Sequence, residues 1–151
     1  MSSKQSGFTL LELMIAFSIA AFLLATSLPA VTKMYDSMKY RGAVKDFISA
    51  VAATRYAAIS QGEAVDLVMT PAENIFQVGD GEIHQLPDSI SFSVKAAREV
   101  SHGKGTGVIR YYPDGRSTGG SIMISHKSGK GVILRVDWLL GRLTQEPYAP
   151  S

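Results

Sequence analysis

An apolar run close to the N-terminus constrains this chain more than any other feature. Residues 8–28 carry one charged side chain, Glu12, among otherwise apolar or small residues. Folded as a helix, the run would rise by about 31 Å, which is the hydrocarbon thickness of a bilayer. It is too long for the apolar core of an ordinary secretory signal peptide. The run therefore predicts a transmembrane helix.

The charge of Glu12 needs an explanation inside such a helix. An unpaired acidic group in lipid costs about 2.5–3.5 kcal/mol, and a simple anchor has no reason to carry that cost. We therefore interpret Glu12 as a polar contact that matters once neighbouring helices are present. The alternative is that its carboxylate reaches back to the membrane surface without a partner.

The sequence around this charge, Gly7–Glu12, reads GFTLLE. It resembles the cleavage and methylation site of type IV pilins and type II secretion pseudopilins. The resemblance implies that a prepilin peptidase cuts between Gly7 and Phe8 and methylates the new amine of Phe8. Because glycine has no side chain, the residue before the cut can lie extended in a narrow protease site. Unlike a secretory signal, the apolar run would be retained.

The resemblance also implies an assembly role for Glu12. After cleavage, the Phe8 amine would stand four residues from the Glu12 carboxylate, on the same helix face. In a filament that carboxylate would meet the amine of an adjacent subunit, and burial would make an unmatched partner costly. The pair would then favour one axial register between subunits.

Two signals give opposite orientations for the predicted span. Lys4 alone precedes the run, whereas several basic residues follow it, namely Lys33, Lys39, Arg41 and Lys45. The positive-inside rule would place the C-terminal part in the cytoplasm. The resemblance implies the reverse topology, which we adopt. We expect a single pass through the bacterial inner membrane, with the C-terminal head in the periplasm.

The helical pattern resumes after Pro29 and is amphipathic. Its apolar residues fall largely at spacings of three and four, which gives one stripe, and Thr54 lies mostly off it. The stripe comprises Val44, Phe47, Ile48, Val51, Ala52, Ala58 and Ile59. Gly62 marks the C-terminal end, so we expect one helix of about fifty residues. The predicted parts of the chain are a leader at 1–7, a transmembrane half at 8–28, a periplasmic half at 29–62 and a β-rich head at 63–151.

Beyond Gly62 the periodicity shifts toward two, as expected for short strands. The predicted strands are 64–70, 75–78, 82–86, 90–94, 108–112, 121–126 and 131–138. Turn sequences between the last three indicate a meander. In the last strand, Trp138 shares a face with Val132, Leu134 and Val136, opposite Asp137, and residues 145–151 read as a polar, proline-bearing tail. The predicted fold class is α+β and pilin-like, with a long N-terminal helix, first transmembrane and then amphipathic, packed on an antiparallel β-sheet head.

Two C-terminal motifs refine the resemblance. Arg110–Gly120 reads RYYPDGRSTGG, and Val136–Arg142 reads VDWLLGR. Together they resemble the minor pseudopilin H group, whose head domain is shared with certain minor type IV pilins. Tight turns and close backbone approaches explain the glycines and Asp114. A docking surface around Arg116 and Arg142 is the functional alternative, and the sequence does not separate the two.

The composition argues against catalysis. The chain contains no cysteine, which excludes disulfides, thiolate metal sites and cysteine nucleophiles. Its three histidines are too widely separated for a metal motif. The glycine-rich segment 103–107 lacks the spacer and the Gly-Lys-Ser/Thr ending of a phosphate-binding loop. We expect no catalytic site, no metal and no cofactor, and hence no enzyme.

The function that the resemblance implies is that of a minor pseudopilin of a type II secretion system. It would sit at or near the tip of a short pseudopilus and help to export folded proteins across the outer membrane. The mechanism would be mechanical, because subunits leave the membrane, stack through their helices and push or gate cargo. Its partners would be other major and minor pseudopilins, the prepilin peptidase, the inner-membrane assembly platform and secreted substrates.

The alternative function is that of a minor type IV pilin in pilus assembly or DNA uptake. Four basic residues could contact phosphates, namely Lys127, Lys130, Arg135 and Arg142. Arg142 is followed by Leu143 and Thr144, however, where DNA-binding relatives tend to carry a further arginine, and Glu146 adds the opposite charge. The net charge of the chain is only +2, so we expect no nucleic-acid binding.

Overall fold

The structure of the protein is a computed structural model, which describes residues 7–96, 105–126, 129 and 131–148. For residues 26–33 it describes the backbone alone. The chain divides into two compact units, Met1–Ser37 and Met38–Ser151. One helix, α1, begins at Leu10 and ends at Gln61, and its 52 residues confirm the predicted long helix.

In the first unit, α1 carries apolar side chains all round rather than on one face. The exposed ones include Leu10, Leu11, Leu13, Met14, Ile15, Phe17, Ile19, Phe22, Leu23 and Leu24. A helix of this kind normally buries such a surface in lipid or among other helices. Within the described side chains, which leave out residues 26–33, no helix is both long and apolar enough to cross a membrane. The span at 8–28 stays a prediction.

In the second unit, α1 buries one face and ends at a glycine. Gly62 has a positive φ of 72°, and its N–H donates to the carbonyl oxygen of Ala58 at 3.1 Å. This left-handed residue closes the helix where the sequence predicted its end. The buried residues of this face are Ala43, Val44, Phe47, Ala50, Val51, Thr54 and Ala58.

The buried face differs from the predicted stripe. Thr54 was expected off the stripe, but it is fully buried, and its hydroxyl donates to the carbonyl oxygen of Ala50 at 2.7 Å. That hydrogen bond satisfies the hydroxyl within the helix, so a polar residue fits an apolar face. Ala52 and Ile59 were expected on the stripe, but both are exposed. Contact with the sheets, rather than hydrophobicity alone, selects the buried face.

The described strands form two four-stranded antiparallel sheets. One contains β1 (Val65–Thr70), β2 (Ile75–Val78), β3 (Ile83–Gln85) and β5 (Gly107–Tyr111), in the order β3-β2-β1-β5. The other contains β4 (Ile90–Ala96), β6 (Gly120–His126), β7 (Gly131–Val136) and β8 (Leu143–Tyr148), in the order β4-β6-β7-β8. The α+β fold class, with a helix packed on antiparallel sheets, is confirmed.

The predicted meander is wrong in its first strand. β5 does not pair with β6, because it pairs with β1 in the other sheet, where Ile109 lies opposite Leu67. Both residues are fully buried. The sequence shows short strands and turns in this region, but a strand can leave one sheet for the other without changing that pattern.

The predicted C-terminal tail is also wrong over most of its length. Residues 143–148 form β8, which pairs with β7 and places Gln145 opposite Leu134. Pro147 made this segment look unlike a strand in the sequence. Proline is tolerated on an edge strand such as β8, however, because its missing N–H can face away from the neighbouring strand and cost no hydrogen bond of the sheet. Residues 149–151 of the predicted tail lie outside the described part of the chain.

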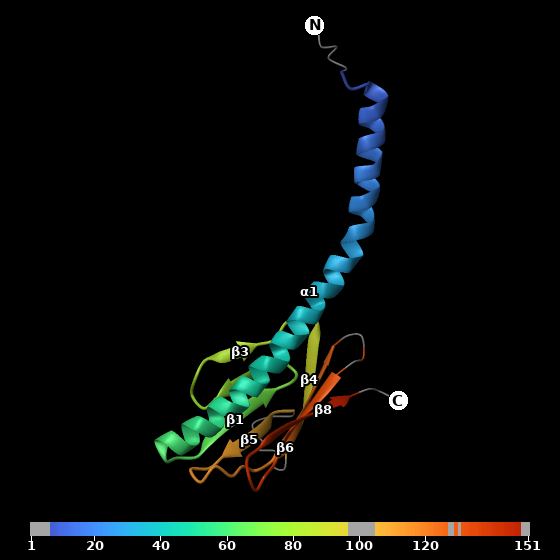
Figure 1. The fold of residues 1–151 in the computed structure, drawn as a ribbon. Helices are drawn as coiled ribbons and strands as arrows, with labels where there is room; N and C mark the ends of the chain where they lie inside the picture. Colours follow the sequence, from blue (N-terminus) through green and yellow to red (C-terminus); the bar gives the residue numbers. More distant parts are fainter. Residues whose placement is uncertain (1–6, 97–104, 127–128, 130, 149–151) are drawn as a thin grey trace. The chain divides into compact units, whose positions relative to one another are not determined.

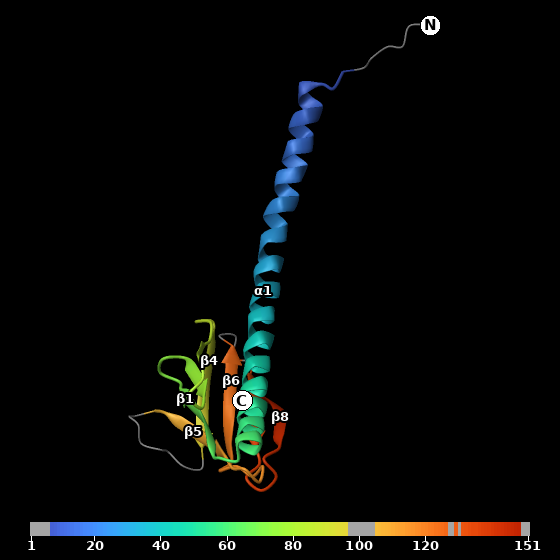
Figure 2. The same cartoon turned by 90° about the vertical axis from the view of Figure 1, so that its left-hand side faces the viewer.

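The core of the second unit lies where α1 meets both sheets (Figure 1 and Figure 2). The fully buried ring of Phe47 contacts Phe76 of β2, with centroids 4.5 Å apart, and Phe92 of β4, at 5.0 Å. Since β2 and β4 belong to different sheets, one helix side chain joins the two. Buried residues of both sheets complete the core, among them Leu67, Met69, Ile109, Ile122, Ile124 and Leu134.

Candidate docking surface

The two loops that carry the C-terminal motifs lie side by side. The first joins β5 to β6 and comprises residues 112–119, and the second joins β7 to β8 and comprises residues 137–142. Ser117 connects them, because its N–H donates to the carbonyl oxygen of Trp138 at 3.1 Å and its hydroxyl to that of Asp137 at 3.0 Å. We call them the paired loops.

The first of the paired loops is a tight turn closed by Asp114. The Asp114 carboxylate accepts a hydrogen bond from the N–H of Arg116 at 3.0 Å and another from the guanidinium Nε of Arg116 at 2.6 Å. The N–H of Gly115 donates to the carbonyl oxygen of Tyr112 at 2.9 Å. The hydrogen bond from the Arg116 backbone, followed by that from its side chain, lowers the pKa of Asp114. The turn therefore keeps this carboxylate ionised and holds Arg116 in place.

The second of the paired loops is closed by Asp137. Its Oδ1 accepts hydrogen bonds from the N–H groups of Leu139 at 2.9 Å and Leu140 at 2.6 Å. Its own N–H donates to the carbonyl oxygen of Arg142 at 2.9 Å. The sequence placed Asp137 on the outer face of a strand, which is wrong, because β7 ends at Val136. The carboxylate caps a turn instead, as aspartate commonly does.

Tyr111 anchors the paired loops to the core. Its ring is fully buried at the end of β5, and its hydroxyl donates to the carbonyl oxygen of Gly141 at 3.1 Å. Burial raises the pKa of Tyr111 to about 12, and the nearby positive charge of Arg55 offsets part of that rise. The phenol is thus neutral at physiological pH and remains a hydrogen-bond donor.

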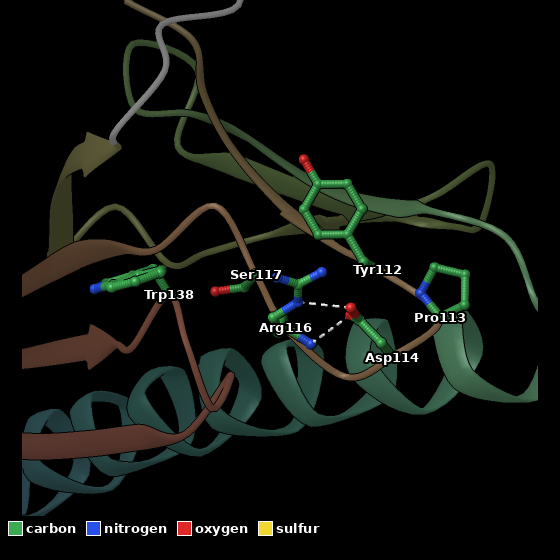
Figure 3. Close-up of a pocket in the computed structure, with 6 residues that line it drawn as sticks. All are labelled: Tyr112, Pro113, Asp114, Arg116, Ser117 and Trp138. Atoms are coloured by element: carbon green, nitrogen blue, oxygen red, sulfur yellow. Dashed lines mark hydrogen bonds and ion pairs between the residues drawn. The ribbon is translucent and has the colours of Figure 1, made fainter.

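The paired loops expose a patch of large apolar side chains. Trp138 is 63% exposed, and Leu139, Leu140 and Tyr112 are also exposed. The prediction that Trp138 shares a strand face with Val132, Leu134 and Val136 is wrong, because β7 ends at Val136 and the chain turns at Asp137 before it reaches the tryptophan. An open cavity of about 530 Å³ is lined by Tyr112, Pro113, Asp114, Arg116, Ser117 and Trp138. Figure 3 shows the Arg116–Asp114 pair with Trp138 on one side, Pro113 on the other and the ring of Tyr112 above it.

The structure thus brings together the loops of the two arginines that the sequence singled out. Arg116 forms an ion pair with Asp114, and Arg142 lies exposed at the end of the second loop. A docking role for either stays a prediction. The exposed Trp138, Leu139 and Leu140 were missed as candidates, although an apolar run that directly follows a strand end was a usable signal.

The residues of the predicted processing site lie in the first unit. Gly7 and Phe8 precede α1, and both are exposed. The N–H of Glu12 donates to the side-chain oxygen of Thr9 at 3.2 Å, so Thr9 caps the helix and Glu12 lies in its first turn. This contact makes Thr9 the N-cap of the helix, and the spacing Thr-x-x-Glu was the signal that the sequence analysis missed. A carboxylate in this position also suits the positive end of the helix dipole.

The predicted basic patch is only partly described. Arg135 forms an ion pair with Glu146 of the neighbouring strand β8 at 3.3 Å, so its charge is partly compensated. Lys127 and Lys130 lie outside the described residues. In the part of the chain that the structure describes, no cluster of three or more histidine or carboxylate side chains could hold a metal ion.

Comparisons with known proteins match most of the chain. The prokaryotic N-terminal methylation motif matches residues 2–28, and the family of the type II transport protein GspH matches residues 43–140. The type II secretion system protein H of Xanthomonas campestris pv. campestris is 27% identical over 141 residues, which cover 93% of this chain and 83% of that protein.

Solved structures with a similar fold include two filament subunits. The minor pseudopilin EpsH of the type 2 secretion system of Vibrio cholerae matches with a TM-score of 0.55 and 10% identity, over 74% of this chain and 98% of that one. The type IV minor pilin FimU of Pseudomonas aeruginosa matches with a TM-score of 0.54 and 18% identity, over 73% and 96%. At these identities the matches show the fold.

We predict opposite effects on stability for two glycine-to-alanine changes, one at the contact between the paired loops and one in α1. Gly141 has a φ of 60°, and a Cβ there would overlap the carbonyl oxygen of Gly115. Gly141→Ala should lower the free energy of unfolding by about 1–3 kcal/mol from backbone strain alone. Gly42→Ala, in α1 with nothing within 4 Å of the new methyl group, should raise it by about 0.4–1 kcal/mol. Urea unfolding of the full chain in detergent measures both, and equal stabilities would contradict the tight contact.

Proposed function

Because this chain belongs to the family of the type II transport protein GspH and is a minor pseudopilin of the type II secretion system, we propose that it assembles at or near the tip of a pseudopilus. There it helps to export folded proteins across the outer membrane. One observation carries the proposal, namely that an N-terminal methylation motif at 2–28 and the GspH region at 43–140 occur in one chain.

The methylation motif and the family indicate a membrane-anchored protein. In the proposed maturation, prepilin peptidase cuts between Gly7 and Phe8 and methylates the Phe8 amine. Residues 8–28 then anchor the chain in the inner membrane, and the periplasmic half 29–62 leads to the head at 63–151. The apolar surface that α1 exposes in the first unit supports this placement, because such a surface requires lipid or other helices around it.

Glu12 has two roles in this proposal. Its backbone N–H is capped by the side-chain oxygen of Thr9, and in the filament its carboxylate pairs with the Phe8 amine of an adjacent subunit. Once lipid or packed helices exclude water, either charge without its partner is costly. The pair therefore favours one axial position of each subunit relative to the next.

A member of this family assembles with other pseudopilins of the secretion machinery. We place one such contact at the paired loops, where Trp138 and Arg116 line an open cavity and Leu139 and Leu140 are exposed on the same loop as Trp138. Exposed aromatic and arginine side chains are typical of the centre of a protein interface. A neighbouring minor subunit docks there, with Arg116 and Arg142 as polar contacts at the rim. The inner-membrane platform drives assembly from the membrane end of the filament.

The alternative function is that of a minor type IV pilin. The type IV minor pilin FimU matches this fold as well as the pseudopilin EpsH does, with TM-scores of 0.54 and 0.55. The fold therefore does not separate the two classes. The family match favours secretion, and the ion pair of Arg135 with Glu146 weakens the basic patch that DNA uptake would use.

A gene deletion tests the proposed function. In a strain that lacks this chain, a normally secreted enzyme should stay in the periplasm, while twitching motility and transformation continue. Exoproteins are compared in periplasmic and medium fractions, with complementation by the intact gene as the control. Normal secretion together with lost piliation or DNA uptake would assign the chain to the type IV pilus instead.

Cleavage after Gly7 is tested by substitution. Gly7→Val places a branched side chain next to the scissile bond, where the protease site is expected to be narrow, so the leader should stay attached. The intact mass of the wild-type protein should correspond to loss of Met1–Gly7 and addition of one methyl group. The mass of the variant should correspond to the full chain without methylation. Ser3→Val, further from the cut, serves as the control. A variant with the same mature mass as wild type would contradict the assignment.

The pairing role of Glu12 is tested with two substitutions. Glu12→Leu and Glu12→Gln both keep the backbone N–H that Thr9 caps and remove the charge, and Glu12→Gln also keeps a polar side chain of the same shape. Loss of one partner of a buried pair costs about 3–5 kcal/mol, so filament incorporation of both variants should fall at least about tenfold, with membrane insertion intact. Shear fractions quantify incorporation. If Glu12→Gln assembles like wild type and Glu12→Leu does not, the polarity of the side chain matters and the pairing of charges is contradicted.

A further inference from the structure

The second unit contains a groove in addition to the open cavity that Trp138 and Arg116 line at the paired loops. It has a volume of about 520 Å³ and runs between α1, which contributes Ile48, Tyr56 and Ile59, and the sheets, which contribute Tyr111 and Leu143. These side chains are apolar apart from the tyrosine hydroxyls. Tyr56 is 75% exposed, and Ile59 is also exposed, so the groove has an apolar rim that is open to solvent.

One cationic side chain lies in this apolar groove. Arg55 is half-buried, and its Nε is buried without a hydrogen-bond partner. The guanidinium lies next to Gly115 of the first of the paired loops. Among the described residues, no carboxylate forms an ion pair with it, whereas Arg110, Arg116 and Arg135 each have one.

An arrangement of this kind is unfavourable in an isolated subunit and favours a particular occupant. A guanidinium loses hydration when an apolar groove closes over it, and that loss is costly unless an anion takes the place of water. A carboxylate matches the planar fork of arginine with two parallel hydrogen bonds. The apolar lining favours aliphatic groups on either side of that carboxylate. A nucleic-acid phosphate would need further cations, and the lining contributes only Arg55.

We propose that the Arg55 groove docks a neighbouring subunit of the filament through a segment that carries an aspartate or glutamate between aliphatic side chains. This proposal rests on the proposed function for the nature of the neighbour. It is a second contact, next to the paired loops, and it gives Arg55 the ionic partner that the described residues do not provide.

The neighbour is a different subunit rather than a second copy. In the second unit of this chain, the described carboxylates whose neighbours in the sequence both carry apolar side chains already have hydrogen-bond or ion-pair partners. Asp66 forms an ion pair with Arg110 at 2.6 Å, and Asp137 accepts two backbone hydrogen bonds. Glu12 also lies between leucines, but it belongs to the segment assigned to the membrane.

Arg55→Met is the first variant, because methionine keeps a long unbranched stem and removes the charge. Since Arg55 has no ionic partner to lose among the described residues, the unfolding midpoint of the full chain in detergent should be unchanged or raised. Incorporation into filaments should nevertheless fall at least fivefold. Lys45→Met, an exposed cation on the same helix outside the groove, is the matched control and should assemble like wild type.

Site-specific crosslinking identifies the occupant. A photoreactive amino acid is placed at residue 56, on the rim of the groove, in full-length protein expressed in cells with the complete secretion apparatus. The crosslinked peptide should come from another pseudopilin and contain an aspartate or glutamate flanked by aliphatic residues. The crosslink should weaken at least fivefold with Arg55→Met and stay unchanged with Lys45→Met. Arg55→Glu should lose it, and a lysine in place of the mapped acid should restore it.

The outcomes separate the groove from the proposed function. A crosslink to a second copy, to a segment without a carboxylate, or to an exported protein would overturn the groove proposal, as would a crosslink that Arg55→Met leaves intact. So would the absence of any crosslink in a subunit that restores secretion to the deletion strain. A crosslink of the expected chemistry to a type IV pilin would uphold the groove and contradict the secretion function.

Discussion

The burial of Phe47 between two sheets is the contact on which the second unit depends. Each sheet has one apolar face, and neither could stay folded with that face in water. Because Phe47 contacts Phe76 in one sheet and Phe92 in the other, α1 completes both cores at once. Truncation of a buried phenylalanine typically costs about 3–5 kcal/mol, which is a large share of the stability of a domain this size. The same contact determines which face of α1 stays in solvent, and so where Tyr56, Ile59 and Arg55 lie.

The paired loops depend on this core through Tyr111. Its ring belongs to the buried cluster, and its hydroxyl reaches the backbone of Gly141 in the second loop. Ser117 then ties the first loop to the second. With the backbone of both loops held in this way, the chain exposes Trp138, Leu139 and Leu140 although it has a well-formed core beside them. Exposed apolar side chains on a rigid support are suited to docking, because little conformational entropy is lost when a partner covers them.

A common property links the N-terminal segment, the paired loops and the Arg55 groove. Each leaves groups that an isolated subunit satisfies poorly, namely an apolar helix surface, exposed aromatic and aliphatic side chains, and a half-buried cation without an ionic partner among the described residues. Here they are distributed over separate surfaces, as is expected for a subunit that several neighbours contact. This distribution agrees with membership in a family of filament proteins.

The sequence by itself determined the long helix, its end at Gly62, most of the strands and the family, because these follow from local periodicity, glycine chemistry and a contiguous motif. It predicted neither the capping of the helix by Thr9 nor the burial of Thr54, although the spacing of Thr9 and Glu12 was a usable signal for the first. The pairing of β5 with β1, the strand β8 and the exposure of Trp138 were decided by the tertiary structure. So were the meeting of the Arg116 and Arg142 loops and the place of Arg55 in its groove. Those features depend on contacts between residues far apart in the chain, and a local pattern of apolar and polar residues is the same whichever distant partner a strand or loop finally meets.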